Sequence, residues 1–210
     1  MYLNILPTGQ EEVIKKLSNY PFIKDFYLSG GTALALQLGH RESVDFDFFG
    51  EKDFEPQELL NILQNDFDVE VDKIERGTLN CRIKNIKLQF LHYPYKLLEE
   101  FINWDGINLS SIVDIACTKM ITVSVRGNKK DYIDIYFLLQ KYDLGELFAK
   151  MELKYTGLDF NEAHIIKSLT YFNEADEQPM PRMHIETDWG NVKKVISSKA
   201  VEYLKKVDVF

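Results

Sequence analysis

Residues 29–49 read SGGTALALQLGHRESVDFDFF, and this stretch decides the expected fold. It begins with the turn Ser29-Gly30-Gly31-Thr32, directly before a short apolar run that predicts a helix. Glycines at such a turn let backbone N–H groups approach an anion, and the positive end of the helix dipole adds to the attraction. The turn is therefore a candidate anion site, although a double glycine before a helix is also typical of a simple tight turn.

The same stretch ends in an alternating pattern over residues 44–49. A strand there places Asp45 and Asp47 on one face and Phe46 and Phe48 on the other. Two neighbouring carboxylates repel each other unless a cation lies between them, and oxygen ligands of this kind suit Mg²⁺. The alternative interpretation is a solvent-exposed polar strand face, which the large apolar neighbours do not exclude.

Composition excludes several classes of protein. The chain has 210 residues, two cysteines and a formal charge of -8, with 33 acidic against 25 basic residues. Two cysteines cannot build a disulfide framework, and an acidic chain is unsuited to coating nucleic acid, because phosphate contacts need clustered lysine and arginine. The N-terminus lacks a secretory signal pattern, and no apolar run reaches the roughly 20 residues that cross a bilayer. We therefore expect a cytoplasmic protein that does not associate with membranes.

Hydrophobic periodicity divides the chain into a mixed part and a helical part, which predicts an α+β protein. In the first part we expect helices at 10–19, 33–38 and 56–65, strands at 44–49, 67–75, 79–84 and 86–92, and a buried connection or strand at 22–28. In the second part we expect helices at about 112–125, 131–141, 144–151, 159–172 and 188–206, with a linker at 174–182. The expected domains are a core with a mixed β-sheet over 1–108 and a helical region over 109–210, with the active cleft between them.

A second group of charged residues lies in the helical part. Asp131 and Asp134 are three residues apart, so they share one face of the expected helix. Lys119 lies among apolar residues, and a lysine buried there needs an acidic partner or a phosphate. The loop 126–130, RGNKK, is basic. An aspartate near a helix start is also an ordinary dipole or capping residue, so this group alone does not establish a site.

Taken together, the motifs resemble the AbiEii-type nucleotidyltransferases. These are DNA polymerase β-like enzymes, many of them toxins of type IV toxin–antitoxin and abortive-infection systems. The resemblance rests on GGTAL at 30–34, RESVDFDFF at 41–49, Asp114 with Lys119, and Lys130-Asp131 with Asp134, in this order. It continues through Tyr171-Phe172, Pro179, Pro181, Trp189 and Val192-Lys193, and so covers most of the chain.

The resemblance implies transfer of a nucleoside monophosphate from an NTP to an acceptor such as RNA or tRNA. Asp45 and Asp47 would hold Mg²⁺ or Mn²⁺ that bridges the phosphates, and Lys119 would neutralise charge on the transferring group. Asp131 or Asp134 would either activate the acceptor hydroxyl or orient Lys119. The residues implied to bind the nucleotide are Ser29, Gly30, Gly31, Thr32, Arg41 and Lys130. The resemblance also implies a cognate antitoxin encoded nearby.

One position departs from the wider pattern. Polymerase β-like enzymes carry a third carboxylate on a later strand, and here the expected strand 86–92 has Gln89 at that position. An amide cannot act as a base and is a poorer Mg²⁺ ligand than a carboxylate. Asp68, Glu70 and Asp72 are candidate substitutes, but their alternation favours a solvated strand face. A one-metal or slow enzyme and a non-catalytic nucleotide-binding protein of the same fold therefore stay open.

Two further interpretations concern the remaining polar and aromatic residues. Tyr132 and Tyr136 lie on the helix that carries Asp131, where one of them is a candidate for stacking on a nucleobase. A third function treats Asp45 and Asp47 as surface residues and the basic loop as a patch that binds a protein. That interpretation predicts no Mg²⁺-dependent affinity for nucleotides.

Overall fold

The computed structural model describes residues 1–207. The chain divides after Ser111 into two compact units, one from Met1 to Ser111 and one from Ile112 onward. The first unit contains every strand among the described residues, and the second is helical. The expected α+β class is confirmed.

The first unit is built on a seven-stranded mixed sheet in the order β3-β4-β5-β2-β1-β7-β6. Two neighbouring pairs, β1 with β7 and β2 with β5, are parallel, and the other pairs are antiparallel. The strands are β1 (Tyr27–Ser29), β2 (Phe46–Gly50), β3 (Val69–Glu75), β4 (Thr78–Ile83), β5 (Ile86–His92), β6 (Ile102–Trp104) and β7 (Ile107–Leu109). The strand that follows the glycine turn, β2, therefore lies in the middle of the sheet.

Helices pack on this sheet through apolar side chains. Helix α2 contacts β1 and β2, and α3 contacts β3 and β4. Their bounds, with those of α1 and two short 3₁₀ helices, are η1 (Leu3–Ile5), α1 (Gln10–Leu17), η2 (Pro21–Asp25), α2 (Gly30–Leu38) and α3 (Pro56–Gln64). Helix α3 begins with Pro56, because proline has no N–H to leave unbonded and its φ suits a first helical turn.

One face of the central strands forms the core of the first unit. Leu28, Phe48, Phe90 and Leu79 are opposite one another on β1, β2, β5 and β4, and each has no exposed surface. The rings of Phe48 and Phe90 stack with centroids 5.0 Å apart. Because side chains alternate along a strand, the residues between these positions point to the other face. That second face carries Asp47.

The structure differs from the sequence expectations at several element ends of the first unit. Strand β2 begins at Phe46, so Asp45 directly precedes the strand, while the alternation of half-buried aspartates with buried phenylalanines is confirmed. The hairpin of β6 and β7 was not expected, because each strand has only 3 residues and shows no periodicity. The sequence feature that indicates this hairpin is the dipeptide Asp105-Gly106. Both residues have positive φ, as a two-residue hairpin turn of this type requires.

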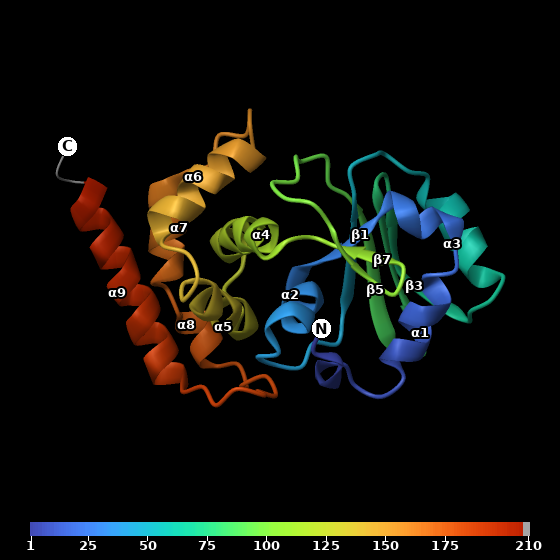
Figure 1. Cartoon of the computed structure of the whole chain (residues 1–210), viewed down its shortest axis with the longest axis horizontal. Helices are drawn as coiled ribbons and strands as arrows, with labels where there is room; N and C mark the ends of the chain where they lie inside the picture. Colours follow the sequence, from blue (N-terminus) through green and yellow to red (C-terminus); the bar gives the residue numbers. More distant parts are fainter. Residues whose placement is uncertain (208–210) are drawn as a thin grey trace. The chain divides into compact units, whose positions relative to one another are not determined.

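The second unit consists of helices arranged around α4. Helix α4 contacts α5, α6 and α7, and α9 packs against α5, α6 and α7 along their outer side (Figure 1). The bounds are α4 (Ile112–Val125), α5 (Lys129–Leu138), α6 (Leu144–Lys154), α7 (Glu162–Leu169), α8 (Asn173–Asp176) and α9 (Trp189–Val207). Helix α4 is apolar on most of its faces because neighbours cover it on several sides.

Two expectations for this unit were wrong. Residues 126–130 do not form one loop, because Lys129 and Lys130 are already the first residues of α5. The expected linker at 174–182 begins within the short helix α8. No helix of residues 1–207 is long and apolar enough to cross a membrane.

Candidate functional site

The glycine turn brings the start of α2 against the Asp47 carboxylate. Gly30 has a φ of 65°, in the left-handed region where a side chain is strained. A Cβ atom at Gly30 would lie 2.4 Å from Asp47 Oδ2 and 3.2 Å from its Cγ. Position 30 is therefore glycine for two reasons, its backbone conformation and the close approach of Asp47.

Replacing Gly30 by alanine tests this arrangement. We expect Gly30→Ala to lower the free energy of unfolding by about 1–2 kcal/mol through left-handed strain, and to displace the Asp47 carboxylate as well. Urea denaturation measures the first effect, and Mg²⁺-dependent binding of nucleotides measures the second. Gly9→Ala is the matched control, since Gly9 has a φ of 92° but no atom within 4 Å of an added Cβ. Equal nucleotide binding by both variants would contradict the proposed role of the close approach.

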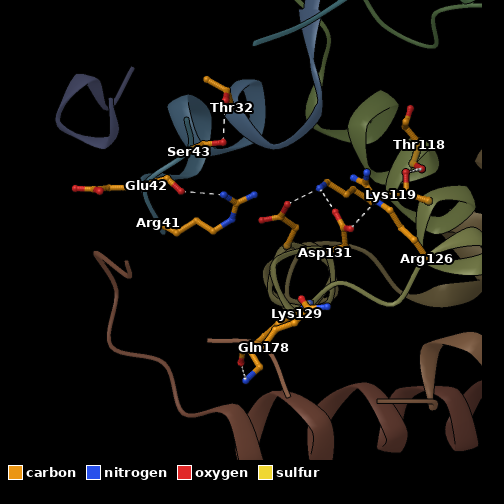
Figure 2. A network of polar contacts seen from close by, with 12 residues as sticks. Thr32, Arg41, Glu42, Ser43, Thr118, Lys119, Arg126, Lys129, Asp131 and Gln178 are labelled. Atoms are coloured by element: carbon orange, nitrogen blue, oxygen red, sulfur yellow. Dashed lines mark hydrogen bonds and ion pairs between the residues drawn. The ribbon is translucent and has the colours of Figure 1, made fainter. Parts of the chain in front are cut away.

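The second glycine of the turn leaves room for Arg41. A Cβ atom at Gly31 would lie 2.6 Å from Arg41 Nη2, so the guanidinium group lies against the first turn of α2. Arg41 is buried, and its Nη1 donates to the carbonyl of Glu42 at 2.8 Å (Figure 2). A fixed positive charge beside the start of a helix strengthens the attraction for an anion there.

Hydroxyl groups connect α2 to the segment before β2. Thr32 Oγ1 lies 2.8 Å from Ser43 Oγ (Figure 2). It also donates to the carbonyl oxygen of Asp45. Ser29, at the end of β1, is buried and lies 2.9 Å from the hydroxyl of Ser110. Its hydroxyl therefore holds β1 and the segment after β7 together, and its binding of a nucleotide stays a prediction.

Asp45 and Asp47 are both half-buried and belong to one short stretch of chain. Among residues 1–207, no group of three or more histidine, cysteine, aspartate or glutamate side chains is placed to hold a metal ion. Two carboxylates offer hard oxygen ligands, and Mg²⁺ commonly takes one or two carboxylates and completes its coordination with substrate phosphates and water. The donor set thus fits a cation that arrives with a phosphate ligand.

Strand β5 places an amide directly beside Asp47. Asp47 and Gln89 are register partners on the parallel strands β2 and β5, so their side chains point to the same face. The candidate substitutes Asp68, Glu70 and Asp72 are exposed, as expected for a solvated face. They belong to β3 or directly precede it, and β4 and β5 separate that strand from β2.

In the second unit, Lys119 lies between two buried carboxylates. Its Nζ is 2.6 Å from Asp131 Oδ1 and 2.6 Å from Asp134 Oδ2, and neither aspartate side chain has exposed surface. Arg126 Nε lies 3.1 Å from the other oxygen of Asp131 (Figure 2). The predicted acidic partner of Lys119 is confirmed, and it consists of both aspartates on one face of α5. The lysine side chain keeps 6% of its surface exposed.

A second buried ion pair lies deeper in the same unit and was not predicted. Lys154 Nζ on α6 is 2.6 Å from Asp114 Oδ1 on α4, and both side chains are 1% exposed. Forty residues separate the partners, so no local spacing signals the pair. Burial raises the pKa of the nearby Cys117 thiol to about 12, which excludes it as a nucleophile near neutral pH.

The start of α5 is held by contacts within the second unit. Lys129 is buried and donates from Nζ to the carbonyl of Gln178 (Figure 2). Its Nζ also lies 5.1 Å from the ring centroid of Trp189. Lys129 therefore does not belong to an exposed basic patch, whereas Lys130 is partly exposed.

The two tyrosines of α5 have structural partners. Tyr132 is buried, its hydroxyl donates to the carbonyl of Tyr171 and lies 2.9 Å from that of Ser168, and burial raises its pKa to about 12. Its ring is 5.0 Å from Phe172. Tyr132 is only 1% exposed and is therefore not available to stack on a base, whereas Tyr136 is half-buried and stacking by Tyr136 stays a prediction. Tyr136 accepts a hydrogen bond from Asn191 at 3.2 Å.

Known structures share this fold. A Helicobacter pylori protein provisionally described as a nucleotidyltransferase superposes with a TM-score of 0.53 at 17% identity, covering 99% of this chain and 96% of that one. MenT4, a nucleotidyltransferase toxin from Mycobacterium tuberculosis, gives a TM-score of 0.54 at 13% identity, covering 90% and 82%. The fold is thus that of the nucleotidyltransferase class.

Sequence comparison narrows the class to a family. The family model described as nucleotidyl transferase AbiEii toxin, type IV TA system, matches residues 12–202. An uncharacterized protein from Aquifex aeolicus is 38% identical over 214 residues, covering 95% of this chain and 98% of its own. The chain belongs to the AbiEii family of nucleotidyl transferase toxins, which confirms the resemblance found in the sequence.

Proposed function

We propose that this protein transfers a nucleoside monophosphate from an NTP to a hydroxyl group of RNA, in a reaction that needs Mg²⁺ or Mn²⁺. One observation carries the proposal: the turn at Gly30 and Gly31 seats the Asp47 carboxylate and the Arg41 guanidinium against the first turn of α2. A helix start binds phosphate, and a carboxylate beside it can share a cation with that phosphate. Family membership supports the class of reaction.

Each residue of the first unit then has a defined task. The backbone N–H groups at Gly30 and Gly31 bind the triphosphate, and Arg41 neutralises part of its charge. Asp45 and Asp47 hold the divalent cation, which on binding withdraws charge from the phosphate oxygens. Thr32 keeps the segment that carries Asp45 close to the start of α2 through its bond to the Asp45 carbonyl.

We assign to Lys119 the task of neutralising the charge that develops on the phosphate during transfer. Asp131 and Asp134 act through Lys119, since both carboxylates already bind its ammonium group at 2.6 Å. They are therefore proposed as positioning residues that orient Lys119, in preference to the other alternative from the sequence, in which one of them activates the acceptor hydroxyl. Lys130, at the start of the same helix, is partly exposed and stays a candidate contact for the triphosphate.

The reaction balances without a further reagent. The acceptor hydroxyl oxygen forms a bond to the α-phosphorus, the bond from that phosphorus to the oxygen bridging to the β-phosphate breaks, and pyrophosphate leaves. The hydroxyl proton passes to solvent, because Gln89 beside Asp47 cannot accept it. A rate that rises with pH is the expected consequence of a solvent base.

Incubation of the purified protein with each labelled NTP, Mg²⁺ and total RNA tests the proposal. We expect label in RNA with at least one NTP and none when EDTA removes the cation. Absence of transfer with all four NTPs would contradict the proposal.

A non-catalytic nucleotide-binding function is the second candidate, and Gln89 beside Asp47 is the observation that favours it. It predicts Mg²⁺-dependent nucleotide binding by calorimetry without pyrophosphate release. Turnover in the labelling assay excludes this candidate.

We propose further that the protein acts in the cytoplasm, where NTPs and RNA are present, as the toxin of a two-component system. An antitoxin encoded by a neighbouring gene is the partner that the family suggests. Co-expression of the neighbouring small gene tests this, with restored growth as the expected result.

A further inference from the structure

A row of polar side chains crosses the face of the sheet that carries Asp47 and extends past this residue. In register, Ser29 on β1 pairs with Asp47 on β2, Asp47 with Gln89 on β5, and Gln89 with Asn80 on β4. Register partners point to the same face. Asp47 thus has the glycine turn on its β1 side and two amides on its β5 and β4 side.

These amides have unused hydrogen-bonding capacity. Asn80 Oδ1 is buried and has no hydrogen-bond partner, and within residues 1–207 no side chain contacts the Gln89 amide through a hydrogen bond. A buried polar atom without a partner lowers the stability of the fold, so it marks a position where a ligand gains affinity by binding. By contrast, the Ser29 hydroxyl at the other end of the row is bonded to Ser110.

Positive charge lies beyond the amides on the same face. Lys87 is two residues before Gln89 on β5, and Arg82 on β4 is its register partner. Lys87 is exposed and has no ion pair within the described residues, whereas Arg82 lies 3.2 Å from Asp72. Lys87 is therefore available to an anionic ligand that also reaches Gln89.

We propose that Gln89 and Asn80 bind the terminal ribose of the RNA acceptor, and that Lys87 binds the phosphate next to it. This rests on the proposed function, in which the glycine turn occupies the β1 side of Asp47 with the NTP. The acceptor must then approach Asp47 from the other side, where the amides lie. Ribose hydroxyls both donate and accept hydrogen bonds, as amides do, and the 2′-hydroxyl is the group that distinguishes RNA from DNA.

Acceptor kinetics and direct binding test this assignment. Gln89→Met keeps the length of the side chain and removes its hydrogen bonds. We expect it to raise the KM for the RNA acceptor about tenfold, with the KM for NTP unchanged. Wild-type protein should prefer an RNA ending in ribose over the same RNA ending in 2′-deoxyribose, and Gln89→Met should lose that preference. A purely structural role of Gln89 would not change this ratio.

Asn80→Leu tests the same assignment through two measurements, stability to urea and affinity for RNA. It removes the unpartnered oxygen, so the variant should be at least as stable as wild type to urea and still bind RNA several-fold more weakly. A variant that is destabilised and binds RNA normally would show a structural role instead.

Lys87→Gln addresses the phosphate contact. The Kd for a short fluorescein-labelled RNA should rise, and the slope of log Kd against log salt should fall by about 1. Lys52→Gln is the matched control, because Lys52 is 83% exposed and lies past the opposite end of β2. Equal effects of the two substitutions would contradict the assignment.

The binding assay separates failure of this inference from failure of the proposed function, because it needs no NTP. RNA binding by wild type that is weakened in the three variants, without transfer of label, retains the assigned RNA contacts and overturns the function. Transfer by wild type with unchanged RNA affinity in all three variants overturns the inference alone. Label appearing on protein instead of RNA overturns the assigned acceptor.

Discussion

Asp47→Asn is expected to reduce nucleotidyl transfer by at least about 100-fold. Substitution of residues that merely orient metal ligands typically costs 10–100-fold, so loss of a ligand itself should cost more. The side chain of asparagine has nearly the same shape, and its amide group is compatible with the close approach to Gly30. The loss therefore reports on charge at this position. Pyrophosphate release from NTP in the presence of RNA is the measurement.

Stability measurements separate this effect from misfolding. Urea denaturation of Asp47→Asn and of wild type gives the folded fraction of each protein, so that transfer rates are compared per folded molecule. Mg²⁺ with NTP should raise the melting temperature of wild type and not of the variant, because ligand binding stabilises only the state that binds.

Asp68→Asn is the matched control for Asp47→Asn. Asp68 belongs to the same unit and is exposed, and β3, which begins directly after it, is at the sheet edge away from β2. Its transfer rate should stay within about twofold of wild type, as for surface substitutions generally. Equal losses in both aspartate variants would contradict a site at Asp47.

The elements that the sequence predicted are those whose patterns are local. Phe46 and Phe48 alternate with the aspartates, and this period places the polar side chains on one face before any partner strand is known. Helix α4 has the predicted bounds, because a serine pair precedes a long apolar run. The β6–β7 hairpin escaped prediction because its strands of 3 residues are too short to show a period.

The residues that escaped prediction depend on contacts between distant segments. Lys154 resembles any lysine in the last turn of a helix, and only its contact with Asp114, forty residues away, shows that it is buried. The sequence predicts Lys129 in a basic loop, whereas it lies at the start of α5 and is buried in contact with Gln178 and Trp189. Lys119 is different, because the apolar residues around it in the sequence already indicate that it needs an acidic partner or a phosphate.

Lys119→Met is expected to lower the free energy of unfolding strongly. It leaves Asp131 and Asp134 buried without the ammonium group that lies 2.6 Å from each. Breaking a buried pair by removing one partner costs about 3–5 kcal/mol, of a total stability that is about 5–15 kcal/mol in typical domains. Urea denaturation at neutral pH measures this loss. Replacing Asp131 and Asp134 by asparagine in the same chain should recover much of it, since no uncompensated charge then stays buried.

Lys154→Met is the control that separates loss of stability from loss of transfer activity. The pair of Lys154 and Asp114 has the same 2.6 Å separation and is buried as deeply, so its loss should destabilise the chain by a similar amount. Per folded molecule, however, Lys154→Met should transfer nucleotide at the wild-type rate. The triple variant, which combines Lys119→Met with Asp131→Asn and Asp134→Asn, should be folded and inactive, because a stable helical unit without the ammonium group cannot neutralise phosphate charge. Activity in that variant would show that Lys119 serves the fold alone.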